Sequence, residues 1–151
     1  MISVDEQFSV DAPPQTVWRM LADPYAVVGC VPGAAIVSMG DDGSLETSLG
    51  VKFGPLNIAF QAHAVLELEP EHMQGRLSAR GRDKQGGARF QASATFNVRA
   101  DAASGGCVVV TRGEVDISGR LASLIEGGAS VVVKRMSADF ASCLQARCAV
   151  G

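Results

Sequence analysis

Residues 119–148 constrain the fold more than any other stretch, because only there does an apolar pattern with a helical period persist over so many residues. Apolar side chains recur at steps of three and four, which predicts one long amphipathic helix from Gly119 to about Cys148. At about 1.5 Å per residue this helix is roughly 40 Å long. It must therefore cross a whole sheet to bury its apolar side.

Length and charge exclude several classes of protein. A chain of 151 residues is one ordinary domain, so we expect a single domain over residues 1–151. The 13 basic and 16 acidic residues give a net charge of −3, and no basic run occurs, which argues against a nucleic-acid binder. No apolar run approaches the roughly 20 residues of a membrane span, and the N-terminus does not resemble a signal peptide. These features indicate a soluble, cytoplasmic protein.

The cysteines are scattered among apolar neighbours. They are Cys30, Cys107, Cys143 and Cys148, and no C-x-x-C pair occurs among them. This spacing argues against a zinc site or a redox dithiol, and we expect reduced thiols that serve mostly in packing.

Before the final helix, the chain is predicted as strands with one helical interruption. Residues 1–11 alternate between apolar and polar side chains, which is typical of a half-buried strand. Two helix starts that contain proline follow, at Asp11-Ala-Pro-Pro and Asp23-Pro, and predict two short helices that end near Ala22 and Gly29. Alternation then resumes with turn residues between short segments, which predicts an antiparallel meander. Its six strands are expected at about residues 34–39, 45–53, 56–68, 73–82, 88–100 and 106–118.

The alternation separates a dry face of this sheet from a wet one. His63 falls on the wet face and His72 in a turn, so neither histidine is expected to bind a metal or to act as an acid or base. The dry face has small residues where a filled core normally has branched or aromatic side chains. They are Ala62, Ala64, Ala79, Gly81, Ala92, Ala94 and Gly113. A cavity beneath the final helix and tight packing of that helix on the sheet both remain open as explanations.

The order of elements resembles the α+β helix-grip fold of START/Bet v 1-like domains in the SRPBCC superfamily. Several local motifs are similar to the CoxG family of carbon monoxide dehydrogenase subunits in particular. They are Phe8-Ser-Val-Asp-Ala-Pro, Cys30-Val-Pro-Gly-Ala, Val51-Lys-Phe-Gly-Pro and Val115-Asp-Ile-Ser-Gly-Arg-Leu-Ala. The resemblance implies a curved, seven-stranded antiparallel sheet that grips a long C-terminal helix, with two short helices between the first and second strands.

The resemblance also implies a function. Members of this family are accessory proteins, not enzymes, that connect a molybdenum hydroxylase such as carbon monoxide dehydrogenase with the membrane and its quinones. We therefore expect an internal cavity for a hydrophobic molecule, namely a prenylated quinone such as menaquinone, and a peripheral position at the inner face of the membrane. No covalent cofactor, metal site or catalytic residue is expected. The alternatives are a structural adaptor that recruits the dehydrogenase without a ligand, and a cyclase- or hydratase-type enzyme on the same fold.

The expected cavity lies between the dry face and the final helix. Its lining is predicted to comprise Phe53, Phe60, Ala62, Phe90, Ala92 and Thr111 from the sheet and Leu124, Val132, Met136 and Phe140 from the helix. Thr47 and Thr111 are the clearest polar intrusions on the dry face and could orient a ligand carbonyl or hydroxyl. The cavity mouth is predicted at Tyr25, Val28, Val31 and Leu56, apolar residues next to glycine and proline that could also touch a bilayer reversibly.

Overall fold

The computed structural model describes residues 1–150, with the side chains of residues 124–127, 149 and 150 left outside the description. Seven strands and three α-helices follow the predicted order, with one 3-10 turn at Pro70–His72. The strands are β1 (Ile2–Val10), β2 (Ala34–Met39), β3 (Leu45–Phe53), β4 (Leu56–Glu69), β5 (Gln74–Asp83), β6 (Arg89–Ala100) and β7 (Cys107–Ser118). The helices are α1 (Pro14–Leu21), α2 (Pro24–Gly29) and α3 (Ala122–Val150).

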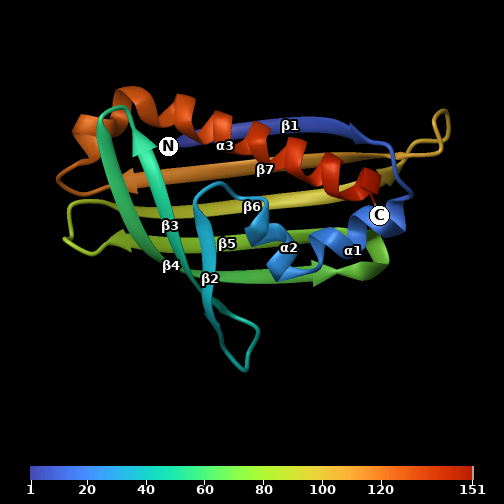
Figure 1. Cartoon of the computed structure of the whole chain (residues 1–151), viewed down its shortest axis with the longest axis horizontal. Helices are drawn as coiled ribbons and strands as arrows, with labels where there is room; N and C mark the ends of the chain where they lie inside the picture. Colours follow the sequence, from blue (N-terminus) through green and yellow to red (C-terminus); the bar gives the residue numbers. More distant parts are fainter. Residues whose placement is uncertain (151) are drawn as a thin grey trace.

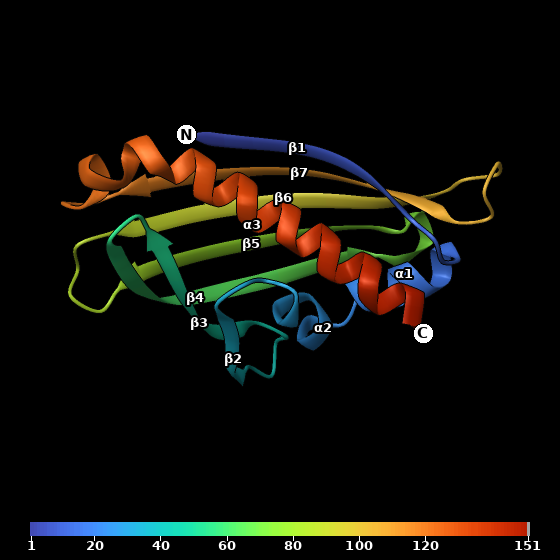
Figure 2. The ribbon, with the colours of Figure 1, turned by 45° about the horizontal axis from the view of Figure 1, so that its top comes forward.

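The seven strands form one antiparallel sheet in the order β1-β7-β6-β5-β4-β3-β2. Strands β2 to β7 are neighbours in chain order, as a meander requires, and β1 pairs with β7 at the far edge. The sheet curves, and α1, α2 and α3 all lie on its concave side (Figure 1). Helix α3 runs obliquely across that side from one end of the sheet to the other (Figure 2), so the predicted helix-grip architecture is confirmed.

The final helix begins three residues later than the sequence pattern predicts. Gly119 has a φ of 107°, which lies outside the helical region and is open to glycine alone at little cost. The chain is held there by a hydrogen bond in which the Leu121 amide donates to the Gly87 carbonyl at 2.7 Å. The turn between β7 and α3 is thereby fixed on the turn between β5 and β6, and helical geometry begins at Ala122.

The apolar residues of the concave side form two separate clusters. The first, here called the α1 cluster, lies where α1 and the end of α3 meet β6 and β7; it includes Val10, Val17, Leu21, Phe96, Val109 and Leu144, with Trp18 and Phe140 packed against it. The second, here called the hairpin cluster, lies at the opposite end of the sheet; it includes Ile58, Phe60 and Ala88, with Phe53, Leu56, Phe90 and Leu121 packed against it. The apolar face predicted from the sequence is therefore present, but its buried residues form two clusters instead of one continuous core.

The expectation of four reduced thiols is wrong for two of them. Cys30, at the end of α2, forms a disulfide with Cys143 of α3, and the two Cα atoms are 5.5 Å apart. Arg147, one turn further along α3, donates from Nη2 to the Gly29 carbonyl at 3.3 Å. Helix α2 has no buried side chain of its own, so these two links account for how it is held against α3. Cys107 and Cys148 are free and buried.

None of the described helices combines the length and the apolar composition that a membrane span requires.

Candidate functional site

The middle of the concave face, between the two clusters, is lined by small side chains. Ala64, Ala79 and Ala92 are directly paired across β4, β5 and β6, and they form one row. Ala94 and Gly113 are paired in the same way across β6 and β7. Because none of these residues reaches far from the sheet, whatever lies above them must come from α3 or from a ligand.

Beside this row, at Gly113, no described atom of α3 lies within 4 Å of the place that a β-carbon would take. A β-carbon added at Gly113 would meet only the Ser93 carbonyl oxygen at 3.6 Å and the Ala94 β-carbon at 3.8 Å, and both belong to the sheet. The backbone of α3 instead comes closest to β1 and β3, which lie towards opposite edges, and to α1. The described part of α3 thus leaves Gly113 uncovered, which is compatible with a ligand space beside it.

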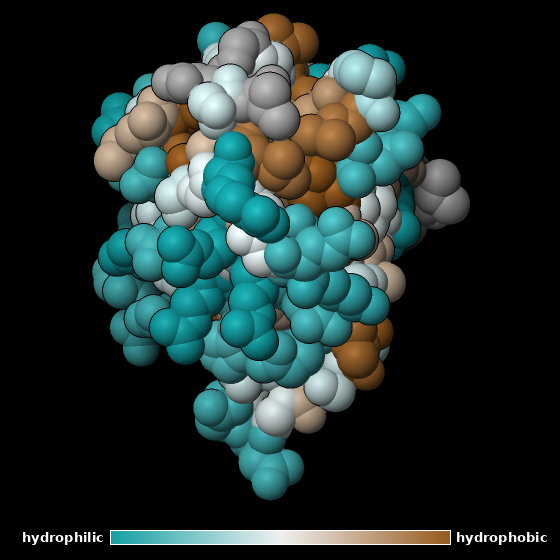
Figure 3. All heavy atoms as spheres, turned by 90° about the vertical axis from the view of Figure 1, so that its left-hand side faces the viewer, coloured by the Kyte–Doolittle hydropathy of each residue, from teal (hydrophilic) through white to brown (hydrophobic). Residues whose placement is uncertain are grey.

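An open groove, here called the α3–β3 groove, is lined in part by inward-facing side chains of β3 and β4. It has a volume of about 760 Å³ and lies between α3 and the hairpin of β3 and β4. Val51 and Ile58 line it from the sheet, Val132 and Met136 line it from α3, and Arg135 and Asp139 stand along its rim. Hydrophobic side chains gather on the α3 side of this end of the molecule, beside a hydrophilic surface over the turns (Figure 3). The groove is thus apolar inside and charged at its edge, as is common for small-molecule sites.

The predicted lining residues fall into three groups. Val132 and Met136 line the α3–β3 groove. Ala62, Ala92 and Thr111 lie in the middle of the concave face, where Ala62 is buried and the other two are half-buried. The aromatic residues flank this middle, with Phe53, Phe60 and Phe90 in the hairpin cluster and Phe140 against the α1 cluster. The side chain of Leu124 lies outside the described residues.

The predicted mouth coincides only in part with the α3–β3 groove. Pro32, Gly33 and Gly54 line the groove, and each lies within two residues of Val31 or Leu56 in the sequence. The four apolar residues predicted there lie elsewhere. Tyr25 projects from α2 with 63% of its surface exposed, Val28 and Val31 are half-buried near the disulfide, and Leu56 packs against the hairpin cluster.

The two threonines of the concave face are already engaged with backbone. The Thr47 hydroxyl donates to the Ala62 carbonyl at 3.3 Å, and the Thr111 hydroxyl donates to the Glu6 carbonyl at 3.5 Å. A hydroxyl has one proton but two acceptor lone pairs, so each oxygen can still accept a hydrogen bond. At these long distances a ligand could also compete for the proton.

Sequence reasoning missed one polar residue on the concave face. Glu6 is half-buried and has the same parity on β1 as Val4 and Phe8, which places it on the inward side of the strand. It is directly paired with Thr111 of β7. The strict alternation from Ile2 to Val10 was the signal that could have identified it.

The described part of the chain contains no group of three or more histidine, cysteine or acidic residues arranged to hold a metal ion.

The two free cysteines lie near one another in the α1 cluster. Burial raises the pKa of the Cys107 thiol, and the neighbouring Cys148 raises it further; burial likewise raises the pKa of Cys148. Thiolate chemistry at neutral pH is therefore disfavoured at both.

Comparison with known families gives one match over nearly the whole chain. The CoxG family, described as a subunit of carbon monoxide dehydrogenase, matches residues 7–149. No curated protein gives a significant sequence match.

Solved structures share the fold at low sequence identity. A conserved protein from Geobacillus kaustophilus superposes with a TM-score of 0.81 at 17% identity, covering 98% of this chain and 95% of its own. The ZhuI aromatase/cyclase from Streptomyces sp. R1128 gives 0.64 at 17% identity, with 97% and 92% covered. A START superfamily protein from Mycobacterium smegmatis gives 0.62 at 15% identity, with 97% and 96% covered. These likenesses establish a START-like fold.

Proposed function

Because the chain belongs to the CoxG family of carbon monoxide dehydrogenase subunits, we propose that it is a non-enzymatic accessory protein that holds an apolar small molecule between its sheet and α3. The ligand in this proposal is a prenylated quinone such as menaquinone. The protein it serves is a molybdenum hydroxylase such as carbon monoxide dehydrogenase. By exchanging its ligand at the inner face of the membrane, the accessory protein links that enzyme to the quinone pool.

The observation that carries the proposal is the division of the core. Two apolar clusters hold the ends of the sheet, while the middle is lined by alanine and glycine, and no described atom of α3 lies within 4 Å of a β-carbon placed at Gly113. A protein that needed only stability would fill such a space, since each missing methylene in a core lowers the free energy of unfolding by about 1 kcal/mol. The α3–β3 groove, at about 760 Å³, has the size of a small-molecule site.

The direct test is to look for the ligand. Protein purified without detergent is extracted with organic solvent, and the extract is analysed by mass spectrometry. The same protein, once delipidated, is titrated with menaquinone. We expect a bound prenylated quinone and saturable uptake of one molecule per chain. An empty extract together with no uptake would favour the adaptor that acts without a ligand.

A pair of variants tests where the ligand lies. Ala92→Phe places a ring in the middle of the concave face, and Ala138→Phe places the same ring on an exposed position of α3. We expect Ala92→Phe to abolish uptake with little change in the free energy of unfolding, because an empty space accepts the ring. Ala138→Phe should bind menaquinone like the unmodified protein. If Ala92→Phe instead destabilises the fold by the roughly 1–3 kcal/mol typical of overpacking, the space was already filled.

Glu6 favours a second candidate function, a cyclase- or hydratase-type enzyme. A carboxylate on the concave face, paired with Thr111, is the kind of group that general acid–base chemistry requires. The likeness to an aromatase/cyclase is compatible with this candidate but shows only the fold. The Glu6→Gln variant decides between them: it should leave menaquinone uptake within about twofold if the protein is a carrier. An enzyme would turn over a polyketide-like or unsaturated substrate and lose that turnover in the variant.

A further inference from the structure

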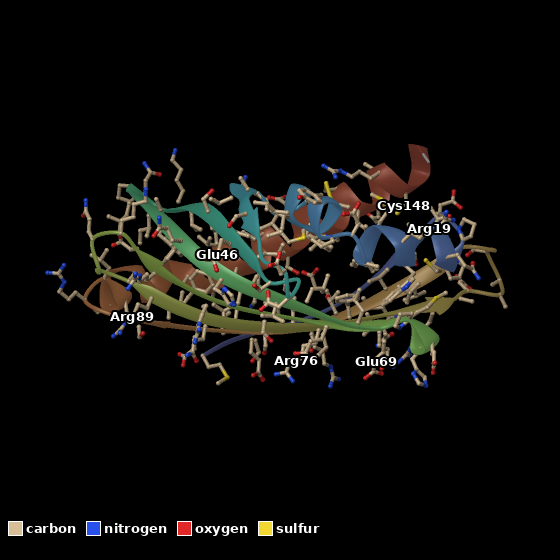
Figure 4. All side chains as sticks on the ribbon, turned by 90° about the horizontal axis from the view of Figure 1, so that it is seen from below. Arg19, Glu46, Glu69, Arg76, Arg89 and Cys148 are labelled. Carbon is tan, nitrogen blue, oxygen red and sulfur yellow. A yellow bond between two sulfur atoms is a disulfide. The ribbon has the colours of Figure 1, made fainter. Side chains whose placement is uncertain are left out.

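The face of the sheet that points away from α3 carries a groove that the proposed function does not use. It has a volume of about 670 Å³ and spans the outward side chains of β3 to β7 near the hairpin end. Three arginines line it: Arg80 and Arg82 from β5 and Arg89 from β6. Arg89 alternates with the inward-facing Phe90 and so points outward, and Figure 4 shows Arg76, further along β5, on the side of the sheet away from α3. We call this feature the arginine groove.

The three guanidinium groups concentrate positive charge in an acidic protein. Arg82 is directly opposite Arg89 in the register of β5 and β6, and Arg80 is two residues away on the same face. Like charges directly opposite one another destabilise a sheet, and the chain as a whole has a net charge of −3. An arrangement that costs stability and runs against the overall charge calls for a role outside folding.

No carboxylate among the described side chains neutralises this charge. Within that part of the chain, Arg80, Arg82 and Arg89 form no ion pair. Two carboxylates do line the arginine groove. Glu46 lies with one oxygen 2.5 Å from Nδ1 of His63, and Asp116 is paired in register with Gln91. The guanidinium groups are thus available to an external anion.

We infer that the arginine groove is a docking site for an extended acidic segment of a protein partner. Alternate side chains of an extended strand point the same way and are about 6.7 Å apart, which is also the spacing of Arg80 and Arg82 along β5. Two carboxylates in alternate positions can therefore meet both arginines at once, and a third can meet Arg89. Arginine binds a carboxylate through two parallel hydrogen bonds, so the contact is strong and also fixes the orientation of the carboxylate.

The surroundings favour a peptide over a lipid surface. Gln61 is paired in register with Arg82, and Gln91 with Arg80, so amide donors and acceptors lie beside the charges and can bind a peptide backbone. No exposed large apolar side chain among the described residues lines the arginine groove, so nothing described there would insert into a bilayer. Because the groove lies on the opposite face from the ligand space, both can be occupied at the same time.

Fluorescence anisotropy with a labelled peptide tests this inference. The probe is a synthetic peptide in which three aspartates alternate with threonines, and its control replaces every aspartate by asparagine. The double variant Arg80→Gln, Arg82→Gln is compared with Arg76→Gln, Arg99→Gln, which removes two positive charges from the same face outside the groove. We expect the acidic peptide to bind with a Kd that rises at least tenfold in the first variant and less than twofold in the second. Binding should weaken as salt is raised and should be absent for the control peptide.

Three results would overturn the inference. Equal loss in both double variants would show a general charge effect without a defined site. Absence of peptide binding by the unmodified protein at low salt would remove the site altogether. Binding to vesicles that contain phosphatidylglycerol, lost in the first variant while the peptide does not bind, would assign the groove to the membrane instead. All four substituted residues are exposed, and matched circular dichroism and thermal unfolding confirm that each variant is folded.

Discussion

The ring of Phe90 lies across Gly81, its direct partner on the neighbouring strand, and occupies the place that a β-carbon at position 81 would need. The same relationship recurs at the other end of the two strands, where Phe96 lies across Gly75. Phe90 meets Phe60 edge-on, with ring centroids 5.0 Å apart, and so belongs to the hairpin cluster. Phe96 belongs to the α1 cluster. Each glycine thus lets one ring lie on the sheet, and the two rings flank the alanine-lined middle.

Two glycine substitutions distinguish filled from empty parts of the concave face. We expect Gly81→Ala to lower the free energy of unfolding by about 1–3 kcal/mol, because its methyl group displaces the Phe90 ring. Gly113→Ala should be neutral or stabilise by up to about 1 kcal/mol, because its methyl group makes only ordinary contacts with Ser93 and Ala94. Urea unfolding of both variants checks this. Equal destabilisation by the two changes would mean that α3 packs closely over Gly113.

Alternation of apolar and polar residues predicted the seven strands, because the side chains on one face of each strand point to the concave side and those on the other face point to water. It could not show that the core is divided, since that depends on which rings lie over which glycines across strands. The pairing of Cys30 with Cys143, 113 residues apart, likewise depends on how α3 crosses the sheet. Glu6 is a different case: its parity was visible in the sequence, but a charged residue was not expected on the dry face.

The Cys30–Cys143 disulfide should contribute substantially to stability. Closing a loop of this length in the unfolded chain predicts a loss of about 2–5 kcal/mol in the free energy of unfolding for Cys143→Ser. Urea unfolding of the variant is compared with that of the unmodified protein with and without a reducing agent. Cys143→Ser should become insensitive to the reducing agent, whereas the unmodified protein should fall to the level of the variant. A count of four free thiols in the denatured, unreduced protein would contradict the disulfide.

The two free thiols should be inert at neutral pH. Only the thiolate reacts with iodoacetamide, and burial raises the pKa of Cys107 and Cys148, so the reactive fraction at pH 8 is smaller than for an exposed cysteine. We expect native protein at pH 8 to be alkylated at least tenfold more slowly than protein in guanidinium chloride, with the native rate rising only at more alkaline pH. Peptide mapping assigns the label. Rapid alkylation of Cys148 at pH 8 would show that the end of α3 opens readily.

The route by which a ligand reaches the interior can be tested with three exposed or half-buried valines. Val131 stands on the wall of the α3–β3 groove with 68% of its surface exposed, Val37 on β2 is 69% exposed outside the groove, and Val28 belongs to the mouth predicted from the sequence. If the groove meets the membrane, an aspartate at position 131 must bring a charge to the bilayer surface, which opposes contact. We expect Val131→Asp to slow menaquinone transfer between liposomes at least threefold, and Val37→Asp to transfer at the unmodified rate.

The contrary outcome is that Val28→Asp loses transfer while Val131→Asp transfers normally. That result would place the mouth at α2 instead, next to the Cys30–Cys143 disulfide. In that case a reducing agent should accelerate transfer by the unmodified protein, because it releases the link between α2 and α3.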